Sequence, residues 1–322
     1  MKTILLTNKY SGIPLQIVQS EIPDGFEMTL LSEQTQEALL EEASKADYIL
    51  AGGRLKITRE VLRRATRLKM IQRSGVGLDA LDLYAIKEKG VPLYVNGGVN
   101  AESVAEYALL LILACLRRLV EIDRNTKNGI WKKQEQGVRT SELKGKTVGI
   151  IGMGNTARTL VGLLKPFHVH ILYYDIFRTD PEYEAENDMT FSDIGGLLSD
   201  SDAVTVHCAL TEETRGLINA ENIARMKPGA VLVNTARGEI VDPGALAEGL
   251  KTGRISYAAL DVHTAEPIPE DYPLKDIGNV ILTPHVAGVT ADSFRAMMRD
   301  AFRNIECFEN GDLDRIAPYR YL

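Results

Sequence analysis

The feature that most constrains this fold is a glycine-rich turn that begins almost halfway along the 322 residues. The stretch "VGIIGMGNTARTL", residues 148–160, has the pattern of an apolar strand, a tight turn and the start of a helix. Gly152, Gly154 and Ala157 match the spacing G-x-G-x-x-G/A. Gly152 permits the tight turn, Gly154 lets the backbone approach a pyrophosphate, and Ala157 is small enough for the helix to pack closely on the strand.

The residues around this turn favour NAD as the bound dinucleotide. The backbone N–H groups of Asn155 and Thr156 are expected to face the phosphates at the start of the helix. Asp175 ends the next apolar run, "HVHILYYD", at the spacing of about 20 residues that such a domain uses. An acid there binds the ribose 2′-hydroxyl and repels a 2′-phosphate, although the nearby Arg178 weakens this preference. We therefore expect an NAD-binding Rossmann domain.

Strand and helix patterns alternate on both sides of the turn. In the first half, apolar runs predict strands over residues 3–7, 27–31, 48–51, 70–73 and 92–95, with helical stretches near 35–46, 58–65 and 80–89. From residue 147 onward, six apolar and β-branched runs have the near-continuous apolarity of parallel strands that are covered on both faces. This alternation predicts an α/β protein with two doubly wound parallel sheets.

Two helices indicate where the chain passes between its domains. A long amphipathic helix is expected over residues 100–122, and a last helix over residues 291–310, which Gly311 should end. We therefore expect a Rossmann NAD-binding domain over residues 101–288, inserted into a flavodoxin-like substrate domain that comprises residues 1–100 and 289–322. Both are long enough to bury a core of their own.

The composition argues against several kinds of partner. The net charge of −7 gives no general attraction to phosphate backbones, so no nucleic-acid partner is expected. The apolar stretch over residues 108–115 is much shorter than the roughly 20 residues that span a bilayer, so no membrane partner is expected either. The three cysteines lack CxxC spacing, which disfavours disulfides or a zinc site and predicts a cytoplasmic protein without a metal.

Further motifs are shared with a known family, in that family's order. They are "RSGVGLDALDL" (73–83), "NAESVAEYAL" (100–109), "ELKGKTVGIIGMG" (142–154), "NTARGEIVD" (234–242), "ALDVHTAEP" (259–267) and "ILTPHVAG" (281–288). Over about residues 50–290 the chain resembles the D-isomer-specific 2-hydroxyacid dehydrogenases, which include D-3-phosphoglycerate dehydrogenases and glyoxylate/hydroxypyruvate reductases. The resemblance implies an NAD-dependent oxidoreductase that interconverts a D-2-hydroxy acid and its 2-keto acid by hydride transfer.

The resemblance implies a catalytic group of Arg237, Glu266 and His285. These residue types suit the chemistry, because a guanidinium can hold a substrate carboxylate and carbonyl through paired hydrogen bonds. An imidazolium at His285 could protonate the carbonyl oxygen as hydride arrives, and the neutral ring could act as the base in the reverse direction. A nearby anion at Glu266 would favour the protonated form of His285.

The resemblance also implies contacts around this group. On the cofactor side, besides the glycine turn and Asp175, it implies contacts from His207, Thr214, Thr235, Ala236, Asp261 and Gly288. On the substrate side, the turn of Ser74, Gly75, Val76 and Gly77 would offer backbone N–H groups to a carboxylate. Arg54 matches an arginine that binds the distal phosphate in phosphoglycerate dehydrogenases, although the surrounding "GGRLK" departs from their pattern. His263 stands where the family usually has an aromatic residue.

The sequence leaves two other functions open. Proteins of this fold with the same three residues include NAD(H)-sensing binding proteins of the corepressor kind, and phosphite dehydrogenase keeps these residues as well. Turnover of a small 2-keto acid substrate, lost on Arg237→Ala, would separate the enzyme from the sensor. The family expectation for assembly is a homodimer through the NAD-binding domain.

Overall fold

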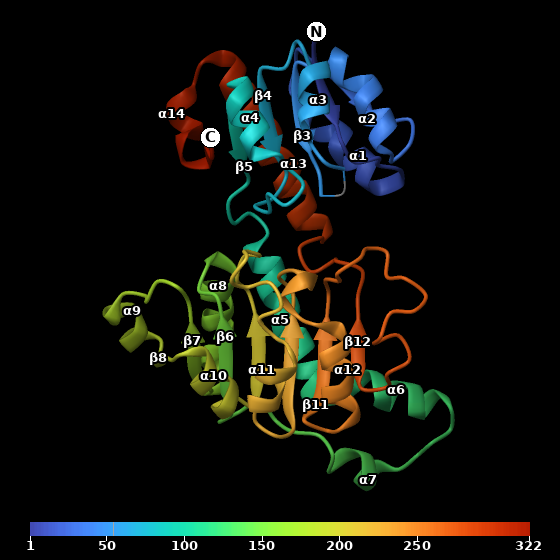
Figure 1. The fold of residues 1–322 in the computed structure, drawn as a ribbon, viewed down its shortest axis with the longest axis vertical. Coiled ribbons are helices and arrows are strands. Elements are labelled where there is room, and N and C mark those ends of the chain that lie inside the picture. The colour runs from blue at the N-terminus through green and yellow to red at the C-terminus, as the bar shows by residue number, and fades with distance from the viewer. Residues whose placement is uncertain (54) are drawn as a thin grey trace. The chain divides into compact units, whose positions relative to one another are not determined.

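The computed structural model describes residues 1–53 and 55–322, so the expected substrate residue Arg54 lies outside the described residues. The contacts within the chain divide it into two compact units (Figure 1). The first unit comprises Met1–Asn100 and Val289–Leu322, and the second comprises Ala101–Gly288. The second unit is therefore inserted into the sequence of the first.

The first unit is built on a five-stranded parallel sheet. Its strands are β1 (Lys2–Leu6), β2 (Phe26–Leu30), β3 (Tyr48–Ala51), β4 (Met70–Arg73) and β5 (Leu93–Val95). They lie in the order β2-β1-β3-β4-β5, and each neighbouring pair is parallel. The order 2-1-3-4-5 is that of flavodoxin-like folds, as the sequence predicts.

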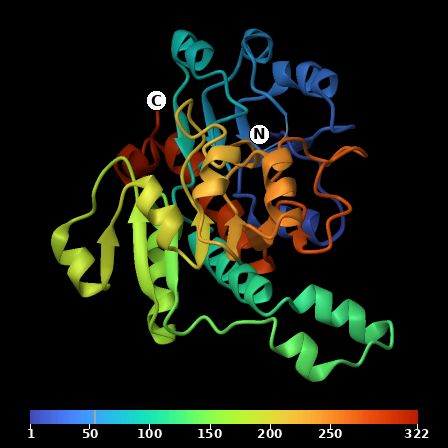
Figure 2. The ribbon, with the colours of Figure 1, turned by 60° about the horizontal axis from the view of Figure 1, so that its bottom comes forward.

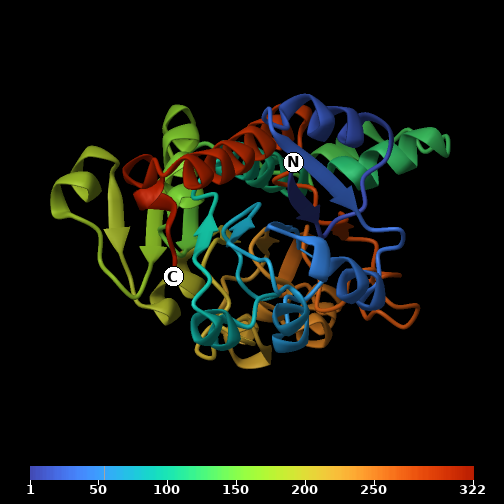
Figure 3. The same cartoon turned by 90° about the horizontal axis from the view of Figure 1, so that it is seen from above.

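Helices cover both faces of this first sheet. They are α1 (Gly12–Glu21), α2 (Gln36–Glu42), α3 (Arg59–Arg64), α4 (Leu83–Lys89), α13 (Ala291–Asn310) and α14 (Leu313–Ile316). Successive strand residues point to opposite faces. Leu5 and Ile49 therefore join a core with side chains of α2, α3 and α4, whereas Ile4 and Tyr48 pack with α1 and α13. α13 is the long red helix of Figure 3, and the short α14 follows it in contact with it.

The last long helix returns the chain to the first unit. The Thr290 hydroxyl accepts the Ser293 N–H at 3.0 Å and caps the start of α13, and Gly311 ends the helix with a φ of 80°. The predicted bounds of this helix are confirmed. α1 was not predicted from the sequence, because only Ile17 and Val18 of that helix are buried and its apolar pattern is weak.

The second unit is built on a seven-stranded parallel sheet. Its strands are β6 (Thr147–Ile151), β7 (His170–Tyr174), β8 (Met189–Phe191), β9 (Ala203–Val206), β10 (Ala230–Asn234), β11 (Ile255–Leu260) and β12 (Val280–Leu282). They lie in the order β12-β11-β10-β9-β6-β7-β8. Counted from β6, this is the 3-2-1-4-5-6 order of dinucleotide-binding folds, extended by β12. The predicted class, two doubly wound parallel-sheet domains, is confirmed.

Both faces of the second sheet are also covered. α5 (Ala101–Leu116) and α8 (Asn155–Leu164) pack together on one face, where Val148 and Ile150 of β6 are fully buried. α10 (Ile194–Asp200), α11 (Ala220–Arg225) and α12 (Pro243–Lys251) cover the other face, around Val204 and Leu232. The short α9 (Pro181–Glu186) leads into the edge strand β8. The carboxyl ends of all seven strands therefore point in one direction.

The prediction of a single helix over residues 100–122 is wrong. α5 ends at Leu116, Arg118 adopts a left-handed φ of 49°, and α6 (Leu119–Lys127) starts a new direction. α6 buries no residue, so no core contact keeps it in line with α5. α6 and α7 (Lys133–Gly137) extend away from the sheet of their unit, as the green segment of Figure 2 shows. None of the described helices combines the length and apolarity needed to cross a membrane.

Candidate active site

The glycine turn has the geometry that a dinucleotide requires. Gly152 has a φ of 94°, and a Cβ there would lie 2.5 Å from the Cys208 backbone nitrogen, so only glycine fits. Beside Gly154 nothing lies within 4 Å of a Cβ position, which leaves open space at the N-terminus of α8. The N–H groups of Asn155 and Thr156 donate to no described residue. Free amides and open space at a helix start fit a pyrophosphate.

Asp175 is tied to this turn in the structure. It follows β7, and its Oδ2 accepts the Met153 N–H at 2.6 Å while its Oδ1 accepts the Phe177 N–H at 3.1 Å. The neighbouring Arg178 is bound elsewhere, through two hydrogen bonds of 2.9 and 2.8 Å to the Glu184 carboxylate. This pairing, together with the Tyr173 hydroxyl, lowers the pKa of Glu184 to about 2. Arg178 is thus occupied and does not offset the Asp175 charge as the sequence suggested.

The loop after β10 presents Arg237. The fully buried Asn234 holds it, because its Oδ1 accepts the Ala236 N–H at 3.0 Å and its Nδ2 donates to the Arg237 carbonyl at 2.8 Å. A Cβ on Gly238 would collide with the His263 backbone, so this loop lies directly against the loop after β11. The half-buried Arg237 therefore lies close to the segment that carries Glu266. Asn234 gave no signal in the sequence beyond ending an apolar run.

His285 and Glu266, two members of the catalytic group that the resemblance implies, lie within hydrogen-bonding distance of each other. His285 Nδ1 lies 3.1 and 3.0 Å from the two Glu266 oxygens, and the backbone N–H of His263 donates to Oε1 at 3.2 Å. Partial burial raises the pKa of Glu266, but the hydrogen bond and charge of His285 outweigh it and leave the pKa below its ordinary value. Glu266 therefore presents a carboxylate to the imidazole.

Asp261 fixes the backbone that carries His285. This fully buried residue follows β11, and its carboxylate accepts the Thr283 hydroxyl at 2.6 Å and the N–H groups of Val286 and Ala287 at 3.0 and 2.8 Å. The Asp261 carbonyl accepts the His285 N–H at 2.7 Å. Such charge-assisted bonds to backbone N–H groups hold a loop firmly. His285 adopts a left-handed φ of 59° at this position.

His263 also braces the site. Its Nε2 lies 3.0 Å from the Thr283 carbonyl, and its Nδ1 lies 3.3 Å from the Tyr272 hydroxyl, with the two rings edge-to-face at 5.5 Å. Burial raises the pKa of Tyr272 to about 12, so its hydroxyl is available to donate to Nδ1. With Tyr272 as the donor, Nδ1 accepts and the Nε2–H group donates to the Thr283 carbonyl. The sequence marked His263 as unusual but gave no signal for Tyr272.

The other expected cofactor residues lie in loops of the same unit. His207 follows β9, its Nε2 lies 2.9 Å from the Thr205 hydroxyl, and burial lowers its pKa to about 4. Thr214 donates to the Ala209 carbonyl at 2.7 Å. The Thr235 hydroxyl is buried with no hydrogen-bond partner among the described residues, which fits a group waiting for a ligand. Gly288 ends the unit.

The expected substrate turn belongs to the first unit, where it follows β4. The buried Arg73 fixes this turn, with its Nε donating to the Gly77 carbonyl at 2.6 Å and its Nη1 to the Ala51 carbonyl at 2.7 Å. Ser74 donates to the same Ala51 carbonyl, whereas Val76 is 55% exposed. In the described part of the chain, no three His, Cys, Asp or Glu side chains gather as a metal site would need.

Comparison with known proteins connects these features. The family model for the NAD binding domain of D-isomer specific 2-hydroxyacid dehydrogenases matches residues 109–287. A glyoxylate reductase of Thermofilum pendens is 40% identical over 282 residues, which cover 87% of this chain and 83% of that protein. A D-3-phosphoglycerate dehydrogenase of Archaeoglobus fulgidus is 37% identical over 271 residues, which cover 84% of this chain but only 51% of that protein.

A solved structure shows the same likeness over the whole chain. The D-lactate dehydrogenase of Aquifex aeolicus, complexed with NAD and lactic acid, aligns with a TM-score of 0.86 at 28% identity, over 99% of this chain and 98% of that one. The glycine turn, the Rossmann sheet and these matches define an NAD-dependent oxidoreductase. The chain belongs to the D-isomer specific 2-hydroxyacid dehydrogenases, which confirms the resemblance seen in the sequence, and its cofactor is NAD.

Proposed function

We propose that this protein reduces a small 2-keto acid to the D-2-hydroxy acid, and catalyses the reverse oxidation, with Arg237, Glu266 and His285 as its catalytic residues. The observation that carries the proposal is the pairing of His285 Nδ1 with the Glu266 carboxylate at 3.0 Å. Because Nδ1 is engaged, Nε2 is the ring nitrogen that can reach a substrate oxygen. Glyoxylate and hydroxypyruvate are the first candidates, because the Thermofilum pendens relative bears the name glyoxylate reductase and a relative from Thermotoga maritima bears the name hydroxypyruvate reductase.

Each residue has one role in this proposal. NADH supplies the hydride when it is bound at the glycine turn. The His285 imidazolium donates its Nε2 proton to the substrate carbonyl oxygen, and the Glu266 carboxylate balances the imidazolium charge before that transfer. Arg237 holds the substrate carboxylate and orients the carbonyl through paired N–H donors. In the oxidation direction the neutral His285 ring accepts the hydroxyl proton.

The contacts around this group are part of the proposal. We assign cofactor contacts to Gly152, Gly154, Asn155, Thr156, Asp175, His207, Thr214, Thr235, Ala236, Asp261 and Gly288. The free amides at the start of α8 and the unpartnered Thr235 hydroxyl support this assignment. We assign substrate contacts to the Ser74–Gly77 turn and to Arg54, which gives the first unit the role of a substrate domain.

A substrate panel tests the proposed activity. NADH oxidation would be followed with glyoxylate, hydroxypyruvate, pyruvate, 2-oxoglutarate and phosphohydroxypyruvate, first in the native protein and then in His285→Ala. We expect one keto acid to be reduced and the variant to lose at least about 100-fold in kcat, as general acid catalysis allows. His170→Ala, an exposed histidine of the same unit, is the control. NADH binding without turnover of any of these keto acids would instead favour an NAD(H)-sensing binding protein or a phosphite dehydrogenase.

We also propose that the protein forms a homodimer through its second unit. Large apolar side chains are exposed on and beside α6 and α7, with Leu119 at 53%, Trp131 at 82% and Val138 at 82%. α6 buries no residue within its own chain, so a second copy would give this surface a partner. Light scattering should report a dimer for the native protein and a monomer for Trp131→Glu. A native monomer would contradict the assignment.

A further inference from the structure

One buried residue contacts all three segments that carry the proposed catalytic residues. His263 lies in the loop after β11, and its backbone N–H donates to Glu266 Oε1 at 3.2 Å. A Cβ on Gly238, which follows the proposed catalytic arginine, would lie 2.1 Å from the His263 carbonyl carbon. The His263 ring reaches the third segment, because its Nε2 lies 3.0 Å from the carbonyl oxygen of Thr283, two residues before His285. A shift of His263 would therefore disturb all three segments at once.

The Thr283 carbonyl connects the His263 ring to the backbone of His285. This oxygen accepts the His285 N–H at 3.1 Å and also faces His263 Nε2. The Thr283 hydroxyl donates to the Asp261 carboxylate at 2.6 Å, so Thr283 is held through its side chain as well. His285 has a left-handed φ of 59°, which a residue other than glycine keeps only where its surroundings hold it. The His263 ring thus acts on a carbonyl that helps to hold this backbone.

Tyr272 fixes the orientation of the His263 ring. Its hydroxyl lies 3.3 Å from Nδ1, and both side chains are buried. Burial raises the pKa of Tyr272 to about 12, so at neutral pH the hydroxyl is protonated and can donate to Nδ1. The ring proton then lies on Nε2, toward Thr283. A phenyl ring of similar size would fill this space but would form neither hydrogen bond, so packing alone does not require a histidine here.

We propose that the His263 imidazole is a positioning residue for the proposed acid–base step, because its Nε2–H group holds the Thr283 carbonyl and thereby the backbone from which His285 meets Glu266. This inference rests on the proposed function. A tilt of the segment would change the 3.0 Å contact between Nδ1 of His285 and Glu266, and hydrogen bonds weaken steeply as their geometry departs from the optimum. The effect should therefore fall on kcat, since this pair carries the proposed proton transfer.

Two substitutions at position 263 separate the hydrogen bond from the packing. His263→Phe keeps an aromatic ring but loses the donor, whereas His263→Gln leaves the space partly empty but places an amide N–H near the position of Nε2. With the best keto acid, His263→Phe should lose about tenfold in kcat, the size of one hydrogen bond, while KM and the affinity for NADH stay within about twofold of the native values. His263→Gln should keep the higher kcat of the two. A native kcat in His263→Phe would show that the ring only fills space.

A double variant separates stability from positioning. His263→Phe leaves the buried Tyr272 hydroxyl without its ring partner, which costs stability. Adding Tyr272→Phe removes that hydroxyl and should raise the melting temperature again, but kcat should stay about tenfold below native because Thr283 still lacks its donor. Tyr257→Phe is the matched control, since it removes a buried hydroxyl of β11 that has no hydrogen-bond partner among the described residues, and its kcat should be native. Recovery of kcat together with stability in the double variant would overturn the proposal.

NMR of the histidine rings gives a readout that needs no turnover. With isotope-labelled histidine, the signals of His263 are those that His263→Phe removes from the set of five histidines. We expect the ring to carry its proton on Nε2, and a proton on Nδ1 alone would overturn the proposal. Activity then separates the two proposals. If the native protein reduces no 2-keto acid, the proposed function fails and the positioning role fails with it, whereas native kcat in His263→Phe contradicts the positioning role alone.

Discussion

His285 and Glu266 are joined across two loops, with Nδ1 of the imidazole 3.0 Å from Oε2 of the carboxylate. The backbone on both sides of this contact is fixed. The Asp261 carbonyl accepts the His285 N–H at 2.7 Å, and the His263 N–H donates to Glu266 at 3.2 Å. These backbone hydrogen bonds near the strand ends set the geometry of the pair. Because both residues are already fixed, bringing the imidazole and the carboxylate together costs little further entropy.

The first prediction concerns Glu266→Gln and the pH dependence of reduction. Because its hydrogen bonds hold the pKa of Glu266 below its ordinary value, the carboxylate is charged throughout the neutral range. Its negative charge favours the protonated imidazole that the proposed acid step needs, so Glu266→Gln should make reduction decline at a lower pH than in the native protein. The kcat–pH profile with the best keto acid measures this. Glu270→Gln, whose side chain is 98% exposed, should leave the profile unchanged. An unshifted profile in Glu266→Gln would separate the pair from catalysis.

The second prediction contrasts two glycines of the same turn. Gly152→Ala places a Cβ 2.5 Å from the Cys208 nitrogen at a φ of 94°, so we expect a loss of stability of about 2–4 kcal/mol. Gly154→Ala meets no atom within 4 Å and should melt like the native protein, but its methyl group occupies the space proposed for the pyrophosphate. Thermal melts and NADH titrations measure the two effects. A native NADH affinity in Gly154→Ala would contradict the proposed cofactor contact.

The third prediction concerns the choice between NADH and NADPH. Asp175→Ser should weaken NADH binding, since it removes the charge proposed for the ribose and the 2.6 Å bond to the Met153 N–H. Asp175→Ser by itself should gain little activity with NADPH, because Glu184 holds Arg178 through two hydrogen bonds. Adding Glu184→Gln releases Arg178 and should raise kcat/KM for NADPH at least about fivefold over Asp175→Ser. If the single variant accepts NADPH equally well, the Arg178–Glu184 pair has no such role.

The fourth prediction concerns acid stability of the first unit. On α13, Glu309 accepts hydrogen bonds from Lys2, Tyr48 and Lys69, and these lower its pKa from 4.5 to about 2. A lowered carboxyl pKa stabilises the folded state above about pH 4.5, and this contribution is lost as the pH falls toward 2. Glu309→Gln should therefore be less stable than the native protein at pH 6, and the two should converge near pH 2. Urea unfolding measures this, and parallel curves over the whole pH range would refute it.

Local patterns were sufficient for most of the architecture. The glycine spacing, the near-continuous apolar strands and the periodicity of the last helix depend on neighbouring residues alone, and each was confirmed. The edge strand β8, of only three residues, and the weakly amphipathic α1 were missed because short or shallow burial leaves little pattern. The break at Arg118 was missed because Leu119 and Val120 continue the apolar pattern on its far side, and the structure places no core beneath α6.

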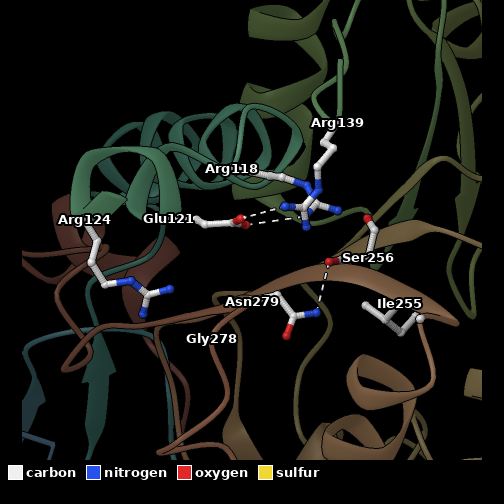
Figure 4. A pocket seen from close by; sticks show the side chains of 9 residues that line it. Arg118, Glu121, Arg124, Arg139, Ile255, Ser256, Gly278 and Asn279 are labelled. Atoms are coloured by element: carbon white, nitrogen blue, oxygen red, sulfur yellow. Dashed lines mark hydrogen bonds and ion pairs between the residues drawn. The ribbon is translucent and has the colours of Figure 1, made fainter. Parts of the chain in front are cut away.

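For the candidate site, the sequence determined the residue types and the tertiary structure decided their partners. The resemblance of the motifs to those of the family pointed to Arg237, Glu266 and His285, and the convergence of strand ends at one edge of a parallel sheet is consistent with that choice. The side chains that fix this group did not follow from the motifs. Asn234 binds the backbone of its own loop and Tyr272 lies beside the His263 ring, and neither contact leaves a pattern in the sequence. Arg118, Arg124 and Arg139 are likewise spread along the sequence, and only the turn between α5 and α6 brings them beside Ser256 and Asn279 (Figure 4).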